Sequence, residues 1–209
     1  MSNELVFYTH PMSRGRIIRW MLEEVGQPYR TELVAWGANK EPGYLAINPM
    51  GKVPALRHGD TVITESAAIC AYLADAFPQA NLAPPHGSKL RGPYYRWLFF
   101  GAGPLEAAWT NKALGFNVTP EGARMAGYGS FDAVINVLEA AVSGKPYLVG
   151  DAFTAADLYV GSHIGFGLQF GMIDKRPAFE QYLARITQRP AAIRAKQMDD
   201  ALMPQQQAG

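Results

Sequence analysis

Two short stretches of this 209-residue chain have residue types that could bind a small peptide carrying a carboxylate. In the first, a turn at residues 48–51 leads through Val53-Pro54 into a short apolar run. The bond before proline is the one at which a cis peptide is cheap, and a proline at the start of a strand leaves its edge partly unpaired. If the Val53-Pro54 bond is cis, we expect the Val53 backbone to face outward, where it can pair with a peptide as an added strand does.

The second stretch is Thr64-Glu65-Ser66, which comes directly before an apolar pattern of helical spacing. A helix that begins here has a hydroxyl and a carboxylate at its N-terminus. Free N–H groups and the helix dipole make such an end attractive to anions. The two stretches together predict a peptide-pairing edge beside a carboxylate-binding helix end.

The elements that must position these stretches alternate between strand and helix. The spacing of apolar residues predicts a strand, a helix, a strand, a hairpin and a closing helix, at residues 5–8, 14–25, 29–34, 54–63 and 65–77. A strand–helix–strand order favours a parallel pair with a right-handed crossover. We therefore predict an α/β domain of thioredoxin-like order at residues 1–81.

The second half of the chain has a different character. Residues 82–87 are rich in proline and form the expected linker, and no convincing strand pattern follows them. Helical patterns are predicted at residues 90–116, 121–142, 154 onward, 177–189 and 190–198. Pro104 should kink the first of these helices, and Thr154 with Asp157 predicts a capping box. The predicted second domain, residues 88–209, is an all-α helical bundle.

Composition excludes several classes of function. The 19 basic and 18 acidic residues are balanced, which argues against a nucleic-acid partner. One cysteine permits neither an intrachain disulfide nor a cysteine zinc site, and the four histidines lack metal-ligand spacing, so we expect no metal. No apolar run approaches transmembrane length and no basic leader is present, so we expect a cytoplasmic protein without a membrane partner.

The pattern N-P-x-G-x-V-P-x-L at residues 48–56, with Glu65-Ser66 opening a helix, resembles the N-terminal domain of cytosolic glutathione S-transferases, bacterial ones included. The resemblance covers nearly the whole chain, since the family also has a hydroxyl-x-x-Asp box like that at Thr154. It implies a homodimeric detoxification enzyme that adds the glutathione thiolate to a hydrophobic electrophile, with glutathione as co-substrate and no cofactor. Glutathione-dependent peroxidase, isomerase or dehalogenase chemistry and a non-catalytic binding protein remain as alternatives.

The resemblance implies how glutathione is held. The backbone of Val53, next to Pro54, should pair with its peptide-like middle, and Glu65 and Ser66 should bind its γ-glutamyl end. Lys52 is the candidate for the glycyl carboxylate.

The resemblance also implies which groups act on the sulfur. Lowering a thiol pKa of about 8.5 by about 2 units needs roughly 2.7 kcal/mol, which a hydroxyl and a helix N-terminus can supply. Ser13 is the favoured donor and Tyr8 the alternative, because different classes of the family use these two positions. No cysteine lies in this turn, which disfavours disulfide chemistry. The candidates for an apolar electrophile pocket are Met12, Phe100, Trp109 and Phe116.

Overall fold

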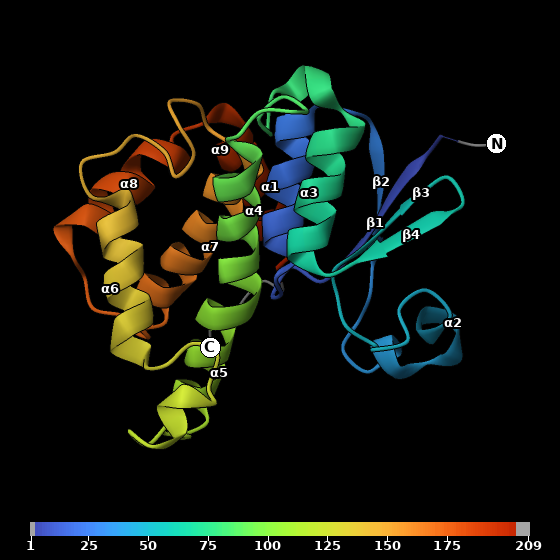
Figure 1. The fold of residues 1–209 in the computed structure, drawn as a ribbon. Helices are drawn as coiled ribbons and strands as arrows, with labels where there is room; N and C mark the ends of the chain where they lie inside the picture. The colour runs from blue at the N-terminus through green and yellow to red at the C-terminus, as the bar shows by residue number, and fades with distance from the viewer. Residues whose placement is uncertain (1–2, 204–209) are drawn as a thin grey trace, which may run out of the picture. The chain divides into compact units, whose positions relative to one another are not determined.

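The computed structural model describes residues 3–203, which form two compact units (Figure 1). The first unit contains residues 3–80 and 189–203, and the second contains residues 81–188. Among the described residues, no helix is long and apolar enough to cross a membrane.

A four-stranded mixed sheet forms the centre of the first unit. Its strands are β1 (Leu5–Thr9), β2 (Tyr29–Leu33), β3 (Ala55–His58) and β4 (Thr61–Thr64), in the order β2-β1-β3-β4. β1 and β2 are parallel, whereas β3 is antiparallel to both of its neighbours. The predicted parallel pair and the predicted hairpin are therefore confirmed, and the arrangement is thioredoxin-like.

Helices α1 (Gly15–Val25) and α3 (Ser66–Ala76) pack against each other, and the short α2 (Pro42–Leu45) lies in the connection between β2 and β3. Single 3₁₀ turns occur at Ala38–Lys40 and Pro78–Ala80. A Cβ atom at Gly15 would clash with the Thr9 hydroxyl, so only glycine permits α1 to start this close to the end of β1. Buried apolar side chains from the sheet and the helices form the core, among them Phe7, Ile18, Met21, Leu56 and Leu73.

The described part of the second unit is helical, as predicted. Its helices are α4 (Arg91–Phe100), α5 (Glu106–Ala113), α6 (Phe131–Val142), α7 (Ala155–Gln169) and α8 (Pro177–Thr187). A π-helical turn, Gly101–Leu105, joins α4 to α5 and contains Pro104. This wider turn accommodates the proline at the point where a kink was predicted.

The predicted helix at residues 121–142 is wrong in its first half. Only a 3₁₀ turn, Gly122–Arg124, forms there, and α6 begins at Phe131. The Ser130 hydroxyl accepts the Ala133 N–H and caps the helix, directly after Gly129, which has φ of 70°. A residue in the left-handed region interrupts a helix, and serine is a favoured N-cap, so the helix starts late.

The predicted capping box at the start of α7 is present. Oδ2 of Asp157 accepts the Thr154 N–H and hydroxyl over 2.8 and 2.9 Å, and Oδ1 accepts the Leu148 N–H and the Tyr182 hydroxyl, both over 2.7 Å. Burial raises the pKa of Asp157, although these hydrogen bonds favour the charged form. One carboxylate thus joins the start of α7, the preceding loop and α8 inside the second unit.

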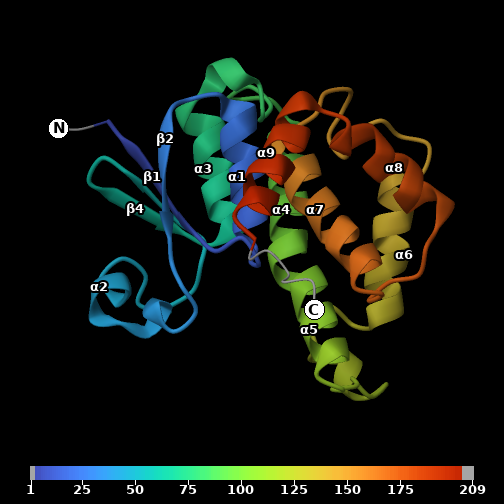
Figure 2. The ribbon, with the colours of Figure 1, turned by 180° about the vertical axis from the view of Figure 1, so that it is seen from behind.

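The last helix, α9 (Pro190–Ala201), corrects the predicted boundary of the all-α domain, because it belongs to the first unit. α9 lies along α1, as Figures 1 and 2 both show. Arg19 of α1 donates to Asp199 of α9 over 2.6 Å, and both side chains are only 1% exposed. Arg189 donates two hydrogen bonds to Glu24 of α1. These pairs hold α9 against α1 within the thioredoxin-like unit.

Candidate functional site

The predicted peptide-pairing edge has the expected local geometry. The Val53-Pro54 peptide bond is cis. Val53 lies between the turn and the first residue of β3, Ala55, and it is outside the paired register of the sheet. Among the described residues, no hydrogen bond to the Val53 backbone is recorded. Its N–H and C=O groups are therefore available for pairing with a ligand.

Asn48 organises the turn that precedes Val53. Its side-chain Oδ1 accepts the Met50 N–H over 3.1 Å, and its Nδ2 donates to the Lys52 carbonyl oxygen over 2.8 Å. The Tyr44 hydroxyl donates to the same oxygen over 2.6 Å. Asn48 is only 2% exposed, so this amide network is buried in the turn. These roles of Asn48 and Tyr44 were not predicted; the asparagine two residues before Met50 is the local signal that indicates such a turn.

Asn39 supports the turn from outside. Its Nδ2 donates to the Gly51 carbonyl oxygen over 2.8 Å. Gly51 has φ of 59°, and a Cβ atom there would come within 2.7 Å of the Asn39 carbonyl oxygen. The turn therefore requires glycine for both its conformation and its space. Lys52 itself is exposed, and among the described residues no partner of its ammonium group is recorded.

The second predicted stretch lies at the end of β4 and the start of α3. Glu65 has φ of 65° and ψ of 119°, which is uncommon for a residue other than glycine. Backbone conformations of this kind cost about 1–3 kcal/mol and occur preferentially at ligand sites. Ser66 is the first residue of α3, and among the described residues its hydroxyl has no recorded hydrogen bond. The free hydroxyl and the helix N-terminus make this point suitable for a carboxylate.

The register of the sheet brings the two stretches together. Tyr8 is opposite Ala55, and Ala55 is opposite Thr64. Tyr8, Ala55 and Thr64 are therefore neighbours across three adjacent strands. Pro54 directly precedes Ala55, and Glu65 directly follows Thr64. Cross-strand neighbours share a face of a sheet. Tyr8, the Val53-Pro54 segment and the start of α3 therefore lie at one end of the sheet within one unit.

Ser13 lies in the turn between β1 and α1. Its hydroxyl donates to the His10 carbonyl oxygen over 2.7 Å and accepts the Gly15 N–H over 2.9 Å. The second contact is a serine-turn bond to the first residue of α1, because the N-cap position of this helix is Arg14 and no side chain caps it. The hydroxyl hydrogen must leave the His10 carbonyl before Ser13 can donate to a ligand.

The hydroxyl of Tyr8 differs from that of Ser13, since among the described residues it has no recorded hydrogen bond. Its ring meets the ring of Tyr44 edge-on, with centroids 6.2 Å apart. Burial is the main cause that raises the pKa of Tyr44 to about 12, and Tyr8 contributes to the shift. Tyr44 therefore stays protonated at neutral pH and keeps its bond to Lys52.

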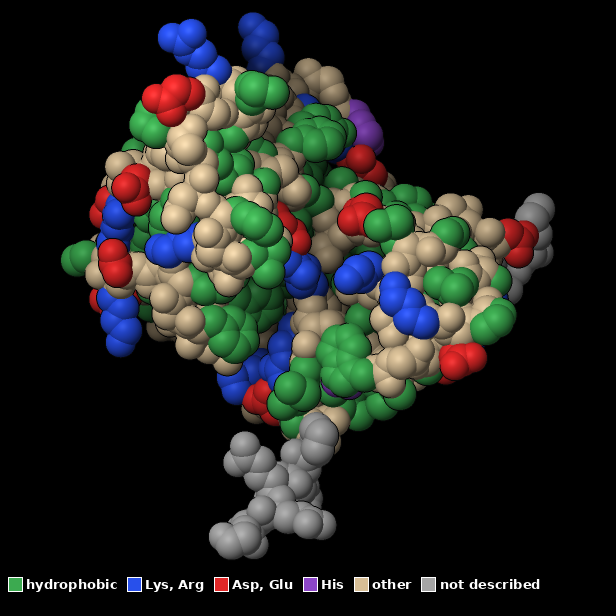
Figure 3. Space-filling model, turned by 90° about the horizontal axis from the view of Figure 1, so that it is seen from below, with side chains coloured by type: hydrophobic (Ala, Val, Ile, Leu, Met, Phe, Trp, Pro, Cys, Tyr) green, Lys and Arg blue, Asp and Glu red, His purple; other side chains and the backbone are tan. Residues whose placement is uncertain are grey.

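The predicted apolar pocket residues are distributed over both units. Met12 belongs to the first unit and is exposed. In the second unit, Phe116 is exposed and Phe100 is half-buried, whereas Trp109 is buried against Gly167. Figure 3 shows one face of the molecule on which hydrophobic side chains are exposed beside lysines and arginines. That these four residues share a pocket stays a prediction.

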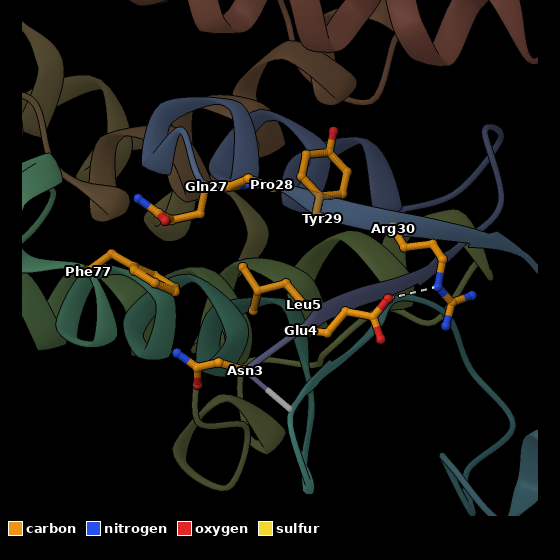
Figure 4. A pocket seen from close by; sticks show the side chains of 8 residues that line it. All are labelled: Asn3, Glu4, Leu5, Gln27, Pro28, Tyr29, Arg30 and Phe77. Carbon is orange, nitrogen blue, oxygen red and sulfur yellow. Dashed lines mark hydrogen bonds and ion pairs between the residues drawn. The ribbon is translucent and has the colours of Figure 1, made fainter. Parts of the chain in front are cut away.

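The first unit has a surface cavity of about 440 Å³ (Figure 4). Its lining comes from the starts of β1 and β2 and from Phe77, at the opposite end of β1 from Tyr8. Glu4 and Arg30 pair across it over 3.1 Å. The Tyr29 hydroxyl of this lining is already bound to Arg19 and Glu23, and the Glu4 and Arg30 charges neutralise each other, so the cavity is not the candidate site.

Two further sequence expectations concern metal and thiol chemistry. Within residues 3–203, no cluster of three or more histidine, cysteine or carboxylate side chains is placed to hold a metal ion. Cys70 is completely buried in α3, and burial raises the pKa of its thiol. A buried thiol of raised pKa is a poor nucleophile.

Comparisons with known proteins point to one family. The family model described as "Glutathione S-transferase, N-terminal domain" matches residues 12–76, and the model described as "Glutathione S-transferase, C-terminal domain" matches residues 120–190. A glutathione S-transferase-like protein of Aspergillus fumigatus, tpcF, is 34% identical over 66% of this chain and 68% of its own length.

Two other comparisons bear on function. Elongation factor 1-gamma of Prunus avium is 31% identical over 73% of this chain, but the match spans only 37% of that longer protein. A sphingomonad glutathione S-transferase, solved in complex with glutathione, superposes with a TM-score of 0.77 at 28% identity and covers 93% of this chain and 98% of its own.

Proposed function

Because this chain belongs to the glutathione S-transferase family, we propose that it binds glutathione and catalyses attack of the glutathione thiolate on a hydrophobic electrophile. One observation carries the proposal. The sheet register gathers an unpaired backbone edge at Val53, an anion-suited helix start at Ser66 and the hydroxyl-bearing Tyr8 at one end of the first unit. The sphingomonad transferase solved with glutathione supports this ligand for a chain of the same fold.

In the proposed complex, glutathione lies along the Val53-Pro54 segment. The Val53 N–H and C=O groups pair with its cysteinyl backbone, as an added strand would. The γ-glutamyl carboxylate accepts hydrogen bonds from the Ser66 hydroxyl and the free N–H groups at the start of α3. The Glu65 carboxylate accepts a hydrogen bond from the γ-glutamyl ammonium group. The exposed Lys52 pairs with the glycyl carboxylate.

The sulfur must lose its proton to become a nucleophile. We propose Ser13 as the hydrogen-bond donor to the thiolate and Tyr8 as the alternative. The Gly15 N–H donates to the Ser13 oxygen, which polarises the hydroxyl and makes it a better donor. Rotation of the hydroxyl hydrogen away from the His10 carbonyl frees it for the sulfur. Tyr8 needs no such rotation, because its hydroxyl has no recorded partner among the described residues.

Conjugation then needs no general base on the protein. A bound thiol whose pKa falls by about 2 units is mostly ionised at neutral pH, and the thiolate attacks the electrophile directly. The carbon–sulfur bond forms while the leaving group, such as a halide, departs with its electron pair. We propose an apolar pocket that includes Met12, Phe100, Trp109 and Phe116 for the electrophile. We further propose that the protein is a cytoplasmic homodimer; sedimentation of the purified protein tests the dimeric state.

A conjugation assay with glutathione and an activated aryl halide tests the proposed activity. Glutathione-dependent formation of the thioether by wild-type protein, reduced in the Ser66→Ala variant at subsaturating glutathione, is the expected result. Calorimetry gives glutathione binding separately from turnover. Absence of both binding and product would contradict the proposal.

The second candidate function is a non-catalytic glutathione-binding or partner-binding protein. The match to elongation factor 1-gamma over 73% of this chain supports this second candidate, because that protein's name describes a translation factor and not a transferase. Glutathione binding without product from aryl halides, peroxides or epoxides would select it. Product from a peroxide alone would instead indicate peroxidase chemistry in the same site.

A further inference from the structure

Helix α9 contains two adjacent aspartates, and each of them forms an ion pair with one arginine of α1. Asp199 accepts from Arg19 over 2.6 Å, and this pair is almost fully buried. Asp200 accepts from Arg16 over 2.7 Å, and this pair is partly exposed. The two arginines are three residues apart and therefore lie on one face of α1. The two pairs are similar in chemistry but differ in what the arginine contacts next.

Beyond its pair with Asp199, Arg19 makes contacts with the sheet. Its Nη1 donates to the Tyr29 hydroxyl over 3.2 Å and to the Thr31 hydroxyl over 3.1 Å, both on β2. Its guanidinium also stacks over the Phe7 ring, 5.2 Å from the centroid. These contacts fasten α1 and α9 to the sheet, so Asp199 has a role in stability.

Arg16 extends toward the turn that contains Ser13. Its Nε donates to the Pro11 carbonyl oxygen over 2.6 Å, while its Nη1 donates to Asp200. The planar guanidinium has its donors in a fixed fork, so a carboxylate on one arm fixes the direction of the other. Asp200 of α9 is thus joined through one side chain to the backbone two residues before Ser13.

His10 makes further contacts inside this turn. Its carbonyl oxygen accepts the Ser13 hydroxyl, and its Nδ1 accepts the Met12 N–H over 3.1 Å. Its ring lies against the Trp36 ring at a tilt of 34°, with the centroids 4.1 Å apart. These bonds shape the turn internally, whereas Arg16 fixes it to α1 and α9. A turn held from both sides keeps the Ser13 oxygen in one place, which a short hydrogen bond to a ligand requires.

We propose that Arg16 and Asp200 are positioning residues for the Ser13 turn, and that α9 thereby tunes the thiolate site at the other end of the sequence. This inference rests on the proposed function, because the tuned property is ionisation of bound glutathione. Neither residue touches the ligand in this scheme. The two neighbouring aspartates therefore have different roles. Asp199 stabilises the fold through Arg19, and Asp200 fixes the Ser13 turn through Arg16.

The test compares Arg16→Gln and Asp200→Asn with wild-type protein in two measurements. The first is the thiol pKa of saturating glutathione, from thiolate absorbance against pH. The second is amide hydrogen exchange at Met12 and Ser13. We expect Arg16→Gln to raise the thiol pKa by about 0.5–1 unit and to speed exchange several-fold, and Asp200→Asn to do both to a smaller degree.

Two control variants separate positioning from general stability. Arg194→Gln removes another pair between α9 and α1, that with Glu23 at 3.0 Å, which has no recorded contact with the turn among the described residues. It should change neither measurement. Asp199→Asn should lower the denaturant midpoint while the folded protein keeps the wild-type thiol pKa.

The outcomes distinguish this inference from the proposed function. Wild-type protein that gives no thiolate signal with glutathione contradicts the proposed function, and the inference falls with it. Wild-type protein that ionises glutathione, with an unchanged thiol pKa in Arg16→Gln, overturns the positioning role alone. A pKa shift of equal size in Arg194→Gln would also overturn it, because the effect would then be a general loosening of α9.

Discussion

The Tyr44 hydroxyl donates to the Lys52 carbonyl oxygen over 2.6 Å, directly before the Val53 edge, and Asn48 donates to the same oxygen over 2.8 Å. The Tyr44→Phe variant removes one of these two donors. We expect glutathione affinity to fall about 2–5-fold, which corresponds to about 0.5–1 kcal/mol for one neutral hydrogen bond. Calorimetric titration measures it. The double variant Tyr44→Phe with Asn48→Ala should bind glutathione more weakly still. Wild-type affinity in the single and the double variant would show that the two bonds to the Lys52 carbonyl oxygen do not support glutathione binding at Val53.

Ser66→Ala tests the carboxylate end of the site. The lost bond is charge-assisted, so glutathione should bind more weakly by about 1–2 kcal/mol. Ser130→Ala is the matched control, because Ser130 also lies at a helix N-terminus but caps α6 of the second unit. It should lower stability and leave glutathione affinity unchanged. Equal affinities of wild type and Ser66→Ala would place the γ-glutamyl end elsewhere.

Asp157→Ala tests the capping box of α7. The change leaves the Tyr182 hydroxyl and the N–H groups of Leu148 and Thr154 without their acceptor in a buried place. We expect the free energy of unfolding to fall by about 3–5 kcal/mol, with glutathione affinity of the folded variant unchanged. Urea unfolding measures the loss. Asp151→Ala, at an exposed position in the preceding loop, should lie within about 0.5 kcal/mol of wild type.

The parts of the fold that depend on neighbouring residues were predictable from the sequence. The Val53-Pro54 segment, the hairpin and α3 each have local signals: a proline at a strand start, Gly59 in a turn, and an apolar helix after Ser66. The capping box is also local, because Thr154 and Asp157 are three residues apart. In each case the residues that determine the geometry lie within one or two turns of one another.

The parts that depend on distant partners, or on the exact backbone path of a turn, could not be predicted from residue types and spacing. The polar sequence of α9 does not show that Asp199 meets Arg19, 180 residues earlier. The position of the Ser13 hydroxyl on the His10 carbonyl depends on the shape of the turn, which residue types alone leave open. The role of Tyr44 likewise depends on where α2 places it against the turn at Asn48. A contact between distant residues decides the first, and the backbone path of a short segment decides the other two.

Tyr29 gives a prediction for alkaline pH. Burial raises its pKa to about 12, although Arg19 acts in the opposite direction, and its hydroxyl donates to Glu23 over 2.9 Å. An unfolded tyrosine ionises near pH 10. The folded state therefore holds a proton that the unfolded state loses, so the stabilisation is complete below about pH 10 and is lost as pH rises toward 12.

Urea unfolding of wild type and Tyr29→Phe at pH 9 and 11 measures this effect. The phenylalanine variant should lose less stability between the two values than wild type, because it no longer carries the shifted group. Tyr44 has a similarly raised pKa, so some alkaline loss should remain in the variant. An identical loss in both proteins would mean that Tyr29 ionises alike in the folded and unfolded states.

The last prediction concerns the donor to the glutathione sulfur. Ser13 combines a hydroxyl, polarised by the Gly15 N–H, with the positive end of α1. We expect bound glutathione to ionise about 2 units below the free thiol, and Ser13→Ala to raise that pKa again by about 1–2 units. Turnover at neutral pH should then fall roughly 10-fold or more. Glutathione affinity should change little, because the bond matters mainly for the ionised sulfur.

Tyr8→Phe is the matched comparison, because it removes the other hydroxyl near the proposed sulfur position and keeps the ring against Tyr44. We expect it to shift the thiol pKa much less than Ser13→Ala. Thiolate absorbance against pH, with saturating glutathione, measures both variants under the same conditions. A shift in Tyr8→Phe without one in Ser13→Ala would assign the thiolate to Tyr8, whose hydroxyl is already free of the His10 carbonyl. If neither variant shifts the pKa, backbone N–H groups at the start of α1 hold the thiolate.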